Sequence, residues 1–410
     1  MTRMKDSGIE WIGEVPEEWG IVRLKDCLEI NNGKDYKDIE TDETGYPVIG
    51  SGGQFAYARK YLHDGTAILL GRKGTIDKPL YIEGKFWTVD TMFYSVPKSG
   101  IYAKFIYYVA LQIPFGLYST NTALPSMTQT DLQNHHFVMP LLDEQTQIAD
   151  FLDKKVAQLD KVKSLLEEQI KTLEDYRQSL IYETVTKGLD KTVPLKDSGV
   201  DWIGQIPEGW GVSRLKYLTN KIGSGKTPLG GAEVFQTEGI LFIRSQNVFD
   251  GRLVLEEKST YIDLQTHNSM ISTEVMEQDI LFNITGASIG RVSIYNFVQK
   301  ANVNQHVAII RGSEKVKPTY LMYYLMSCIG KFQVALNQVG GNREGLTFEQ
   351  LKQFIIAFPT REEQTKIADF LDKKTEQINQ MIAIKKEQIE NINKQRQTLI
   401  YDYVTGKRRV

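Results

Sequence analysis

Residues 5–13 read KDSGIEWIG and residues 196–204 read KDSGVDWIG, so one block stands twice in the chain. A second block, IADFLDKK, occupies residues 148–155 and returns at 367–374. The first pair lies 191 residues apart and the second 219, so the second copy carries 28 additional residues. Between these blocks the two copies are mostly dissimilar. Each copy thus consists of a constant block, a variable region and a second constant block. This order indicates an internal repeat with a shared framework or partner and two different recognition regions.

The composition is that of a water-soluble globular protein of two to three domains, with 410 residues, 41% of them hydrophobic and 24% charged. We find no apolar run of the roughly 18 residues that a membrane helix needs. The first residues, MTRMKD, contain no apolar signal segment, and we therefore expect a cytoplasmic protein. Cys27 and Cys328 are too few for a disulfide framework or a cysteine zinc site, and we expect no metal.

The constant block at residue 148 begins a predicted helix that runs without glycine or proline from Glu144 to about Thr186. Its apolar residues recur every seven positions, and the second copy repeats them with Lys385 in place of one leucine. Such heptads predict a left-handed coiled coil, here about 64 Å long. The alternative is two separate amphipathic helices, each packed on its own domain. The predicted seam residues are Leu152, Leu159, Leu166, Leu173, Leu180, Leu371, Ile378, Ile392 and Leu399.

We predict an α+β protein with two globular domains separated by two long antiparallel coiled-coil helices, as a pseudo-twofold internal repeat. Antiparallel pairing would place the variable regions at opposite ends of a rod and bring the second helix back to the first block. Short apolar runs broken by glycine predict strands near 46–50, 67–71, 240–243 and 279–282. The predicted segments are a first domain at 1–143, a helix at 144–190, a second domain at 191–362 and a helix at 363–410.

The loops of both variable regions are rich in amide, hydroxyl and basic side chains. Arginine pairs with guanine, and asparagine or glutamine with adenine, so these side chains suit direct reading of bases. Polar loops are more often merely solvated, which is the simpler interpretation of any single residue. The candidate DNA-binding residues are Arg72, Lys73, Thr75, Lys226, Thr227, Arg244, Gln246, Asn247, Asn283, Thr285, Arg291, Asn304, Gln305, Asn342 and Arg343.

Two apparent catalytic motifs fail on inspection. Residues 223–227 read GSGKT, the end of a phosphate-binding loop, but Asn220 stands where its first glycine belongs and Pro228 disfavours the helix that should follow. Asp77, Glu83 and Lys85 imitate a metal-dependent nuclease site, although a solvated turn is the favoured interpretation. We therefore expect no catalytic residues in this chain.

The layout resembles the specificity (S) subunit of type I restriction-modification systems, over essentially the whole chain. The resemblance rests on the motif KDSGxxWIGxxPxxW at 5–19 and 196–210, and on PxxxEQxxI at 140–148 and 359–367. Residues 280–290 followed by Asn304-Gln305 are similar to the usual pattern inside a recognition domain. The first copy departs from that pattern, since LLGRKGTI at 69–76 is a loose equivalent and Val89-Asp90-Thr91 replaces Asn-Gln.

The resemblance implies that each variable region is a target recognition domain reading one half of a bipartite double-stranded DNA sequence. The helices would set the spacing and dock two modification subunits, which would bind S-adenosylmethionine and methylate adenine. A restriction subunit would join them and cleave DNA with ATP and Mg²⁺. The chain itself would be a non-catalytic subunit without a cofactor. Its five-leucine seam spans about 42 Å, close to one DNA turn, so the half-sites should lie about one turn apart.

The net charge of −2 gives no sign of a strongly basic DNA-binding protein. The four predicted segments carry net charges of −4, −3, +2 and +3, so neither globular domain is strongly basic. We therefore expect weak DNA binding by the chain alone, with much of the phosphate-contacting charge supplied by partner subunits. Two other classes remain open: a coiled-coil scaffold whose domains bind proteins, and a self-contained nuclease that uses Asp77, Glu83 and Lys85.

Overall fold

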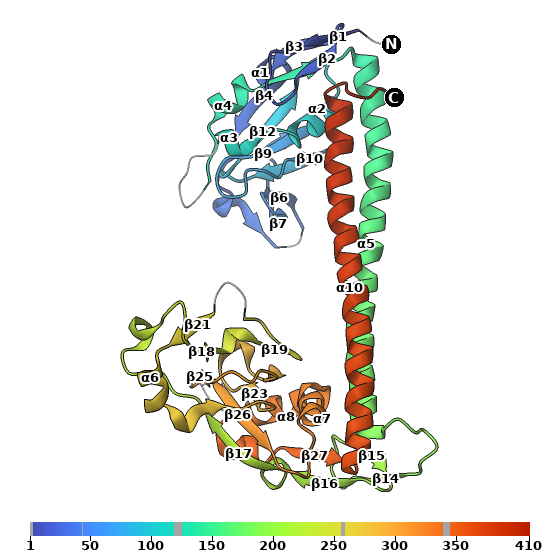
Figure 1. Cartoon of the computed structure of the whole chain (residues 1–410). Helices are drawn as coiled ribbons and strands as arrows, with labels where there is room; N and C mark the ends of the chain where they lie inside the picture. Colours follow the sequence, from blue (N-terminus) through green and yellow to red (C-terminus); the bar gives the residue numbers. More distant parts are fainter. Residues whose placement is uncertain (1–2, 43, 119–124, 256–258, 339–344) are drawn as a thin grey trace. The chain divides into compact units, whose positions relative to one another are not determined.

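The computed structural model describes residues 3–42, 44–118, 125–255, 259–338 and 345–410 (Figure 1). By its internal contacts the chain divides into two compact units. Unit 1 comprises Met1–Glu167 and Lys385–Val410, and unit 2 comprises Glu168–Ile384. Each unit is therefore completed by parts of the chain that are distant in sequence.

Both predicted long helices are present, as α5 (Leu142–Lys187) and α10 (Arg361–Val404). The 46 residues of α5 contain no glycine or proline and extend about 69 Å at the α-helical rise. Acidic residues occupy the first turn of each helix, where they stabilise the positive end of the helix dipole. The apolar periodicity of the sequence and the acidic residues at the helix starts thus indicate the same bounds for these helices.

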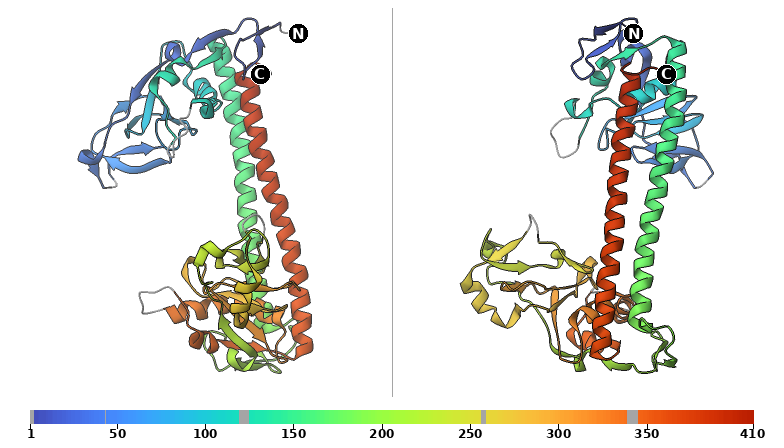
Figure 2. Two further views of the ribbon diagram at one scale, coloured as in Figure 1. Left: turned by 60° about the vertical axis from the view of Figure 1, so that its left-hand side comes forward. Right: turned by 45° about the vertical axis from the view of Figure 1, so that its right-hand side comes forward.

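Within each unit, part of α5 packs antiparallel against part of α10 (Figures 1 and 2). In unit 1 the rings of Phe151 and Tyr403 lie 4.6 Å apart, and Arg396 Nε lies 3.3 Å from Asp160 Oδ1. In unit 2 the Arg177 side chain donates a hydrogen bond to the Asn379 side chain. The predicted antiparallel pairing of the helices is confirmed, and the alternative of two unpaired helices is excluded.

The heptad residues of both helices are turned away from water to different degrees. Leu152, Leu371 and Ile378 are buried, and Leu152 and Leu371 belong to the cores of their globular domains. The remaining members are half-buried, and of these Leu180 and Leu399 also pack against the domain cores. The half-buried seam residues are Leu159, Leu166, Leu173, Leu180, Ile392 and Leu399.

Unit 1 contains two larger sheets, with strand orders β10-β9-β12-β4 and β5-β7-β6-β11-β8, and the ribbons β1-β2 and β13-β3. Within the second sheet, β6 and β11 run parallel. The strands of unit 1 are β1 Met4–Asp6, β2 Glu14–Pro16, β3 Gly20–Arg23, β4 Leu28–Asn32, β5 Glu40–Thr41, β6 Tyr46–Gly50, β7 Gly53–Ala58, β8 His63–Asp64, β9 Ala67–Gly71, β10 Leu80–Ile82, β11 Lys85–Thr88, β12 Met92–Pro97 and β13 His136–Met139. Its shorter helices are α1 Leu24–Cys27, η1 Lys37–Ile39, α2 Ala103–Ala110, α3 Phe115–Tyr118 and α4 Gln129–Asn134.

Unit 2 contains the sheets β17-β26-β23-β24 and β21-β18-β25-β22, and the ribbons β14-β15, β16-β27 and β19-β20. Its strands are β14 Leu195–Asp197, β15 Gln205–Pro207, β16 Gly211–Arg214, β17 Thr219–Ser224, β18 Ile240–Ile243, β19 Val248–Phe249, β20 Arg252–Leu253, β21 Thr260–Ile262, β22 Glu274–Val275, β23 Ile280–Asn283, β24 Val292–Ile294, β25 Ala301–Val303, β26 Val307–Gly312 and β27 Ile355–Phe358. Its shorter helices are η2 Leu215–Tyr217, η3 Gly231–Val234, η4 Ser245–Asn247, α6 Leu264–Ser269, η5 Ile271–Thr273, η6 Gly286–Ser288, α7 Pro318–Met326, α8 Cys328–Gln338 and α9 Phe348–Lys352.

The two units repeat one arrangement of strands. The order β4-β12-β9-β10 in unit 1 corresponds to β17-β26-β23-β24 in unit 2. The parallel pair β6 and β11 corresponds to the parallel pair β18 and β25. α4 and α9 each begin at a threonine, Thr128 and Thr347, whose side chain accepts a hydrogen bond in a capping box. The four strands expected from apolar runs are present as β6, β9, β18 and β23, and the internal repeat is confirmed.

The constant residues at the helix starts connect each helix to its own domain. The indole of Trp19 donates to Glu144 Oε2 at 3.1 Å, and the indole of Trp210 donates to Glu363 Oε1 at 3.2 Å. Each indole is largely buried, so the carboxylate gives its N–H a partner away from bulk water. These contacts explain why tryptophan and glutamate stand in both constant blocks.

A second repeated contact joins each long helix to α2 in unit 1 and to α7 in unit 2. The Tyr108 hydroxyl donates to Asp153 Oδ1 at 2.8 Å, and the Tyr323 hydroxyl donates to Asp372 Oδ1 at 2.7 Å. In both units burial raises the pKa of the tyrosine above its ordinary value. The constant blocks therefore form a framework that holds helix and domain together.

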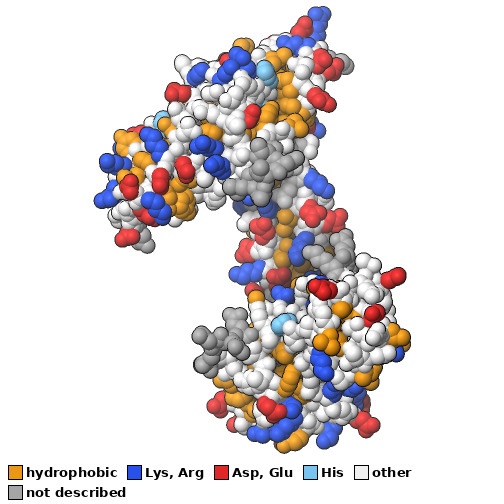
Figure 3. Space-filling model, turned by 90° about the vertical axis from the view of Figure 1, so that its left-hand side faces the viewer, with side chains coloured by type: hydrophobic (Ala, Val, Ile, Leu, Met, Phe, Trp, Pro, Cys, Tyr) orange, Lys and Arg blue, Asp and Glu red, His pale blue; other side chains and the backbone are white. Residues whose placement is uncertain are grey.

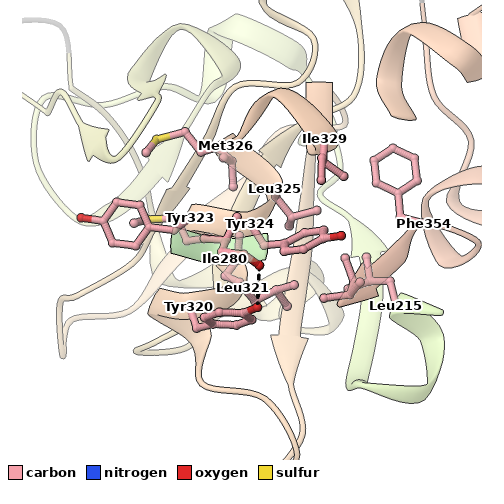
Figure 4. Packing of buried hydrophobic residues seen from close by; sticks show 14 of the residues in the cluster. Leu215, Ile280, Tyr320, Leu321, Tyr323, Tyr324, Leu325, Met326, Ile329 and Phe354 are labelled. Atoms are coloured by element: carbon pink, nitrogen blue, oxygen red, sulfur yellow. Dashed lines mark hydrogen bonds between the residues drawn. The ribbon is translucent and has the colours of Figure 1, made fainter. Parts of the chain in front are cut away.

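The main core of unit 2 is built largely by α7, whose buried side chains face β23 and the neighbouring strands (Figure 4). Tyr320 is fully buried, and its hydroxyl donates to the carbonyl of Ala357 at 2.7 Å, so the polar group is satisfied inside the core. Leu371 of α10 and Ile181 of α5 belong to the same core. The long helices are therefore integral to the domain rather than attached to its surface.

The C-terminal end of α10 packs on the first constant block of unit 1 (Figure 2). The Tyr401 hydroxyl donates to the carbonyl of Trp11 at 3.0 Å, and Lys407 donates to the carbonyl of Glu14. Gly406 has a φ of +72°, and a side chain there would collide with Pro16. In unit 2 the equivalent glycine after the long helix is Gly188, which also has a positive φ and lies against Pro207 and Trp210. The end of each long helix therefore packs on a constant block in the same way.

Among the described helices, none is long and apolar enough to cross a membrane. On the face drawn in Figure 3, lysine and arginine side chains are interspersed with aspartate and glutamate over both units. This mixed surface agrees with the small net charge of every segment.

Candidate nucleic-acid interface

Four loops of each unit meet at one end of the sheets, and we call each meeting point a corner. The unit 2 corner consists of residues 225–229, 284–290, 304–306 and 345–347. The unit 1 corner consists of residues 33–36, 72–76, 89–91 and 125–128. Each loop of one corner has a counterpart in the other, as the backbone hydrogen bonds show.

The first loop of each corner follows the edge strand β4 or β17. In unit 2 the amide of Gly225 donates to the carbonyl of Val307 and that of Lys226 to Val303, both at 3.1 Å. In unit 1 the amide of Gly33 donates to Met92 at 3.0 Å and that of Lys34 to Thr88 at 2.9 Å. Lys34 and Lys226 therefore occupy equivalent positions, and both side chains are exposed.

The other three loops are tied together in the same repeated way. In unit 2 the amide of Ile284 donates to His306 at 3.0 Å, and the amide of Leu346 donates to Ile284 at 2.8 Å. In unit 1, Arg72 takes the place of Ile284: its amide donates to Thr91 at 2.9 Å and its carbonyl accepts from Met127 at 2.9 Å. The backbone frame of the corner is therefore the same in the two units.

Glycine is required where the first loop crosses the neighbouring strand end. A Cβ on Gly225 would lie 1.7 Å from the carbonyl oxygen of Val303, and one on Gly33 would lie 2.0 Å from that of Val89. Neither contact can be relieved by moving a side chain, since both involve backbone atoms. The P-loop-like GSGKT is thus a strand end in close contact with its neighbour, not a phosphate loop.

The unit 2 corner presents one exposed lysine, Lys226, together with neutral polar side chains joined by hydrogen bonds. The Thr285 hydroxyl lies 2.6 Å from His306 Nδ1, and His306 Nε2 lies 3.2 Å from Gln305 Nε2. The Thr227 hydroxyl donates to Gln305 Oε1. Asn304 accepts a hydrogen bond from the His306 backbone amide through Oδ1, at 3.3 Å. Gln305 and Thr227 are exposed, and the corner therefore offers amide and hydroxyl groups to solvent.

The unit 1 corner carries more charged groups, of both signs: Lys34, Arg72 and Lys73 stand with Asp35 and Asp90. Lys34, Lys73 and Thr75 are exposed, whereas Arg72 is half-buried. The Arg72 guanidinium donates to the carbonyl of Asp90 at 3.3 Å and lies 5.8 Å from the centre of the Phe93 ring. Positions equivalent to Gln305 and His306 hold Asp90 and Thr91. The predicted candidates of this copy therefore do come together, with chemistry unlike that of unit 2.

Two predicted candidates of unit 2 lie inside the domain. Asn247 accepts a hydrogen bond from the Arg244 amide at 2.9 Å and donates to the carbonyl of Val254 at 2.9 Å. Asn283 is fully buried and donates to the Ser245 carbonyl at 2.8 Å. We infer that both asparagines hold the loops of the corner in place and do not themselves contact a ligand.

The remaining candidates lie beside the corner. Gln246 is exposed and Arg244 is half-buried against the Phe235 ring, at 5.8 Å. Arg291 lies 4.8 Å from the centre of the Phe249 ring, and Arg252, which was not among the candidates, lies 5.4 Å from the same ring. These two guanidiniums form a basic shelf next to the loop at 284–290. Asn342 and Arg343 lie outside the described residues.

Lys34 and His306 belong to the corners but were not among the candidates predicted from the sequence. A signal for Lys34 exists, since Asn32-Gly33-Lys34 and Ser224-Gly225-Lys226 stand 192 residues apart, one more than the first repeated block. His306 gave no such signal, because its role depends on Thr285, which lies on a different loop.

The described residues contain no group of three or more histidine, cysteine, aspartate or glutamate side chains that could hold a metal ion. Of the three residues considered for a nuclease site, Lys85 is paired with Asp64 at 3.9 Å and lies over the Tyr61 ring, and Glu83 accepts a hydrogen bond from Tyr81. Lys85 and Glu83 are thus engaged with neighbouring side chains of β8 and β10 and of the segment before β8.

Comparison with known proteins agrees with the repeated geometry. A family model described as "Type I restriction modification DNA specificity domain" matches residues 16–174 and 207–392. The chain is 26% identical to the putative type I restriction enzyme MjaX specificity subunit of Methanocaldococcus jannaschii, covering 97% of this chain and 96% of that protein. It is 25% identical to the type I restriction enzyme EcoBI specificity subunit of Escherichia coli, covering 92% and 85%.

Two solved structures share the fold. One chain, from work on complex assembly and conformational transition of the type I R-M system, matches with a TM-score of 0.71 and 16% identity, covering 95% of this chain and 98% of that chain. The HsdS subunit from Thermoanaerobacter tengcongensis matches with a TM-score of 0.51 and 17% identity, covering 98% and 100%. With the family model matching most of the chain, half by half, this protein belongs to the type I restriction-modification specificity subunits, which are non-catalytic components of those systems.

Proposed function

We propose that each unit reads one half of an asymmetric, bipartite DNA target through its corner. The observation that carries this proposal is the pair of corners, which share their backbone hydrogen bonds and differ in their exposed side chains. A constant frame with variable side chains is what two different base sequences would require. Basic groups suit phosphates and guanine, whereas amides suit adenine.

The small charge of the chain favours weak binding to DNA by the isolated protein. Sequence-independent affinity for duplex DNA comes chiefly from lysine and arginine near phosphates. Each unit offers only a few such groups near its corner, among them Lys34 and Lys73 in unit 1 and Arg252 and Arg291 in unit 2. We propose that partner subunits supply the rest of the phosphate contacts.

The long helices carry one repeated feature that suits a pair of identical partners. Val162 and Leu165 on α5 in unit 1 are 47% and 48% exposed. Their counterparts 219 positions later, Met381 and Ile384 on α10 in unit 2, are 43% and 56% exposed. Each unit thus shows one exposed apolar pair at the same repeat position. We propose that each pair docks one modification subunit.

In this proposal the modification subunits hold S-adenosylmethionine and methylate adenine, and restriction subunits cleave DNA with ATP and Mg²⁺. The specificity subunit supplies recognition and assembly. The paired helices set the distance between the half-sites, which we expect to lie about one DNA turn apart. Insertion of one heptad into both helices should lengthen this gap or abolish methylation, and an unchanged gap would argue against the helices as a ruler.

The test of the recognition proposal is co-expression of the chain with its modification subunit in a host without adenine methylation, followed by genome-wide mapping of methylated adenines. We expect one asymmetric motif made of two short half-sites and a fixed gap. Absence of any motif would favour the protein-binding scaffold. Mg²⁺-dependent cleavage of DNA by the purified chain would favour the nuclease hypothesis based on Asp77, Glu83 and Lys85.

The docking proposal has a separate test in the stoichiometry of the complex. Replacing Val162 and Leu165 together with lysine should remove one of two modification subunits, because charge would enter an apolar contact. Native mass spectrometry reports the composition directly. Ser164→Lys, an exposed change between the two positions, is the matched control and should leave two subunits bound. Retention of both subunits by the double variant would contradict the proposed surface.

A further inference from the structure

The most constrained exposed side chain of the unit 2 corner is the amide of Gln305. Its oxygen accepts a hydrogen bond from the Thr227 hydroxyl, and its nitrogen lies 3.2 Å from His306 Nε2. Although Gln305 is exposed, its side chain is thus held at both ends of the amide. A long polar side chain on a surface is ordinarily free to choose among many rotamers.

The direction of these hydrogen bonds follows from donor and acceptor chemistry. An amide nitrogen only donates, so His306 Nε2 must be the acceptor and carry no proton. The ring proton then lies on Nδ1, which faces the Thr285 hydroxyl at 2.6 Å. With this tautomer the Thr285 hydroxyl accepts from Nδ1–H, and His306 Nε2 accepts from the amide nitrogen of Gln305.

The held amide keeps unused capacity for a ligand. An amide has two N–H groups and two oxygen lone pairs, so after the bonds to Thr227 and His306 one N–H and one lone pair of the exposed Gln305 remain for a ligand. This donor–acceptor pair matches the major-groove edge of adenine, which offers N7 as an acceptor and N6–H as a donor. A freely rotating amide could present the same two groups in either order.

We propose that Gln305 reads an adenine in the half-site of unit 2 and that His306 is a positioning residue that fixes the order of the Gln305 donor and acceptor. This inference rests on the proposed function, that unit 2 reads one half of a DNA target. Unit 1 has Asp90 and Thr91 at the equivalent positions and lacks the arrangement. The effect of both residues is therefore confined to one half of the motif.

The test uses the complex of the full-length chain with its modification subunit and selection from a randomised duplex DNA library, with the bound fraction sequenced. The complex with the wild-type chain should select a bipartite motif with adenine at one position governed by Gln305. Gln305→Ala should reduce the preference for adenine there by about 5- to 150-fold, the range of one bidentate contact, and leave the other half unchanged. Gln305→Glu should shift the preference toward cytosine, because a carboxylate accepts from cytosine N4.

The positioning role of His306 has a signature of its own. His306→Ala should weaken the base preference at the same position of the motif as Gln305→Ala does, because the Gln305 amide becomes free to rotate by half a turn. His306→Gln should restore the preference, because its side-chain oxygen can accept from Gln305 where Nε2 did. Gln353→Ala removes an exposed glutamine near the start of β17, at the opposite end of that strand from the corner, and should change nothing.

Each contrary outcome is distinct. A complex of the wild-type chain and its modification subunit that selects no motif would overturn the proposed function, and the inference with it. A wild-type motif that Gln305→Ala leaves intact would overturn the inference and leave the proposed function standing. Loss of affinity without change of base preference would assign Gln305 to the DNA backbone. Relaxation of a different position by His306→Ala, or failure of His306→Gln to restore the preference, would remove His306 from the reading group.

Discussion

The two corners differ in chemistry although their backbones are tied together in the same way. Both corners expose the equivalent lysines Lys34 and Lys226, but unit 1 has Lys73 where unit 2 has Thr285, and Asp90 where unit 2 has Gln305. In unit 2 two further basic groups stand beside the corner, on the Phe249 shelf. The difference shows that the hydrogen bonds of the frame do not depend on the side chains that it presents. Recognition can therefore change by substitution without rebuilding the fold.

The largest effect should come from breaking the frame itself. Gly225→Ala and Gly33→Ala each drive a Cβ into a backbone carbonyl, and we expect each to destabilise its own unit by about 3 kcal/mol or more. Hydrogen exchange with mass spectrometry reports the two units separately. Gly223→Ala and Gly52→Ala, where a Cβ meets nothing within 4 Å, are the matched controls. Equal effects of test and control variants would mean that the close approach is not required.

A pH dependence should distinguish the units next. Burial lowers the pKa of His135 in unit 1 from 6.5 to about 4, whereas Phe354 occupies the equivalent place in unit 2. The unfolded state therefore binds a proton at a higher pH than the folded state does. Stability is full above pH 6.5 and falls by about 3 kcal/mol as the pH drops toward 4.

His135→Phe tests this difference, because it installs the unit 2 residue in unit 1. The variant should remove most of the stability loss between pH 6.5 and 4 from unit 1, as followed by hydrogen exchange in that unit. Unit 2 in the same molecule serves as the internal control. An unchanged pH profile in unit 1 would assign the acid sensitivity to other groups.

The salt dependence of DNA binding should then reflect the two exposed lysines of the unit 1 corner, Lys34 and Lys73. Removing Lys34 and Lys73 together should reduce the slope of log K against log salt by about 2, since each phosphate that a lysine neutralises adds about 0.9 to it. The affinity should fall by a similar factor for all sequences. Lys60→Ala removes an exposed lysine between β7 and β8, away from the corner, and should leave the slope unchanged. A changed base preference with an unchanged slope would place these lysines on bases instead.

The smallest expected effect concerns the shelf of unit 2. Arg291→Ala should lower the same slope by about 1 and leave the selected motif unchanged, since its guanidinium stacks on Phe249 beside the corner. Arg291→Lys keeps the charge and serves as the control. A loss of base preference at one position of the motif after Arg291→Ala would mean that Arg291 contacts a base. The two corners would then differ less in how they recognise DNA.

Much of the fold was predictable from the sequence because its signals are local. The heptads of α5 and α10 and the apolar runs that form β9 and β23 each lie within one continuous segment. The repeated blocks indicated a shared framework, but the contacts that form it, such as that of Trp19 with Glu144, became evident only in the structure.

The corners were less predictable because they assemble from loops far apart in the chain. Asn247 and Asn283 have the side chains of base readers, yet the strand ends turn them inward, where they satisfy backbone groups. Lys34 stands in a stretch that reads as an ordinary turn, and only its equivalence to Lys226 places it at the corner. Composition identifies suitable side chains, but tertiary pairing decides which of them face solvent.

The central claim is that the two units share one backbone frame and each reads its own half-site. The most direct test is a chimera that replaces residues 20–139 with residues 211–358 of the same chain. These segments begin and end at equivalent points of the pairs β3–β13 and β16–β27. Methylation mapping of the chimera with its modification subunit should yield a motif whose first half has become a copy of the second. A motif that keeps the original first half, or in which both halves change, would contradict the assignment of one half-site to each unit.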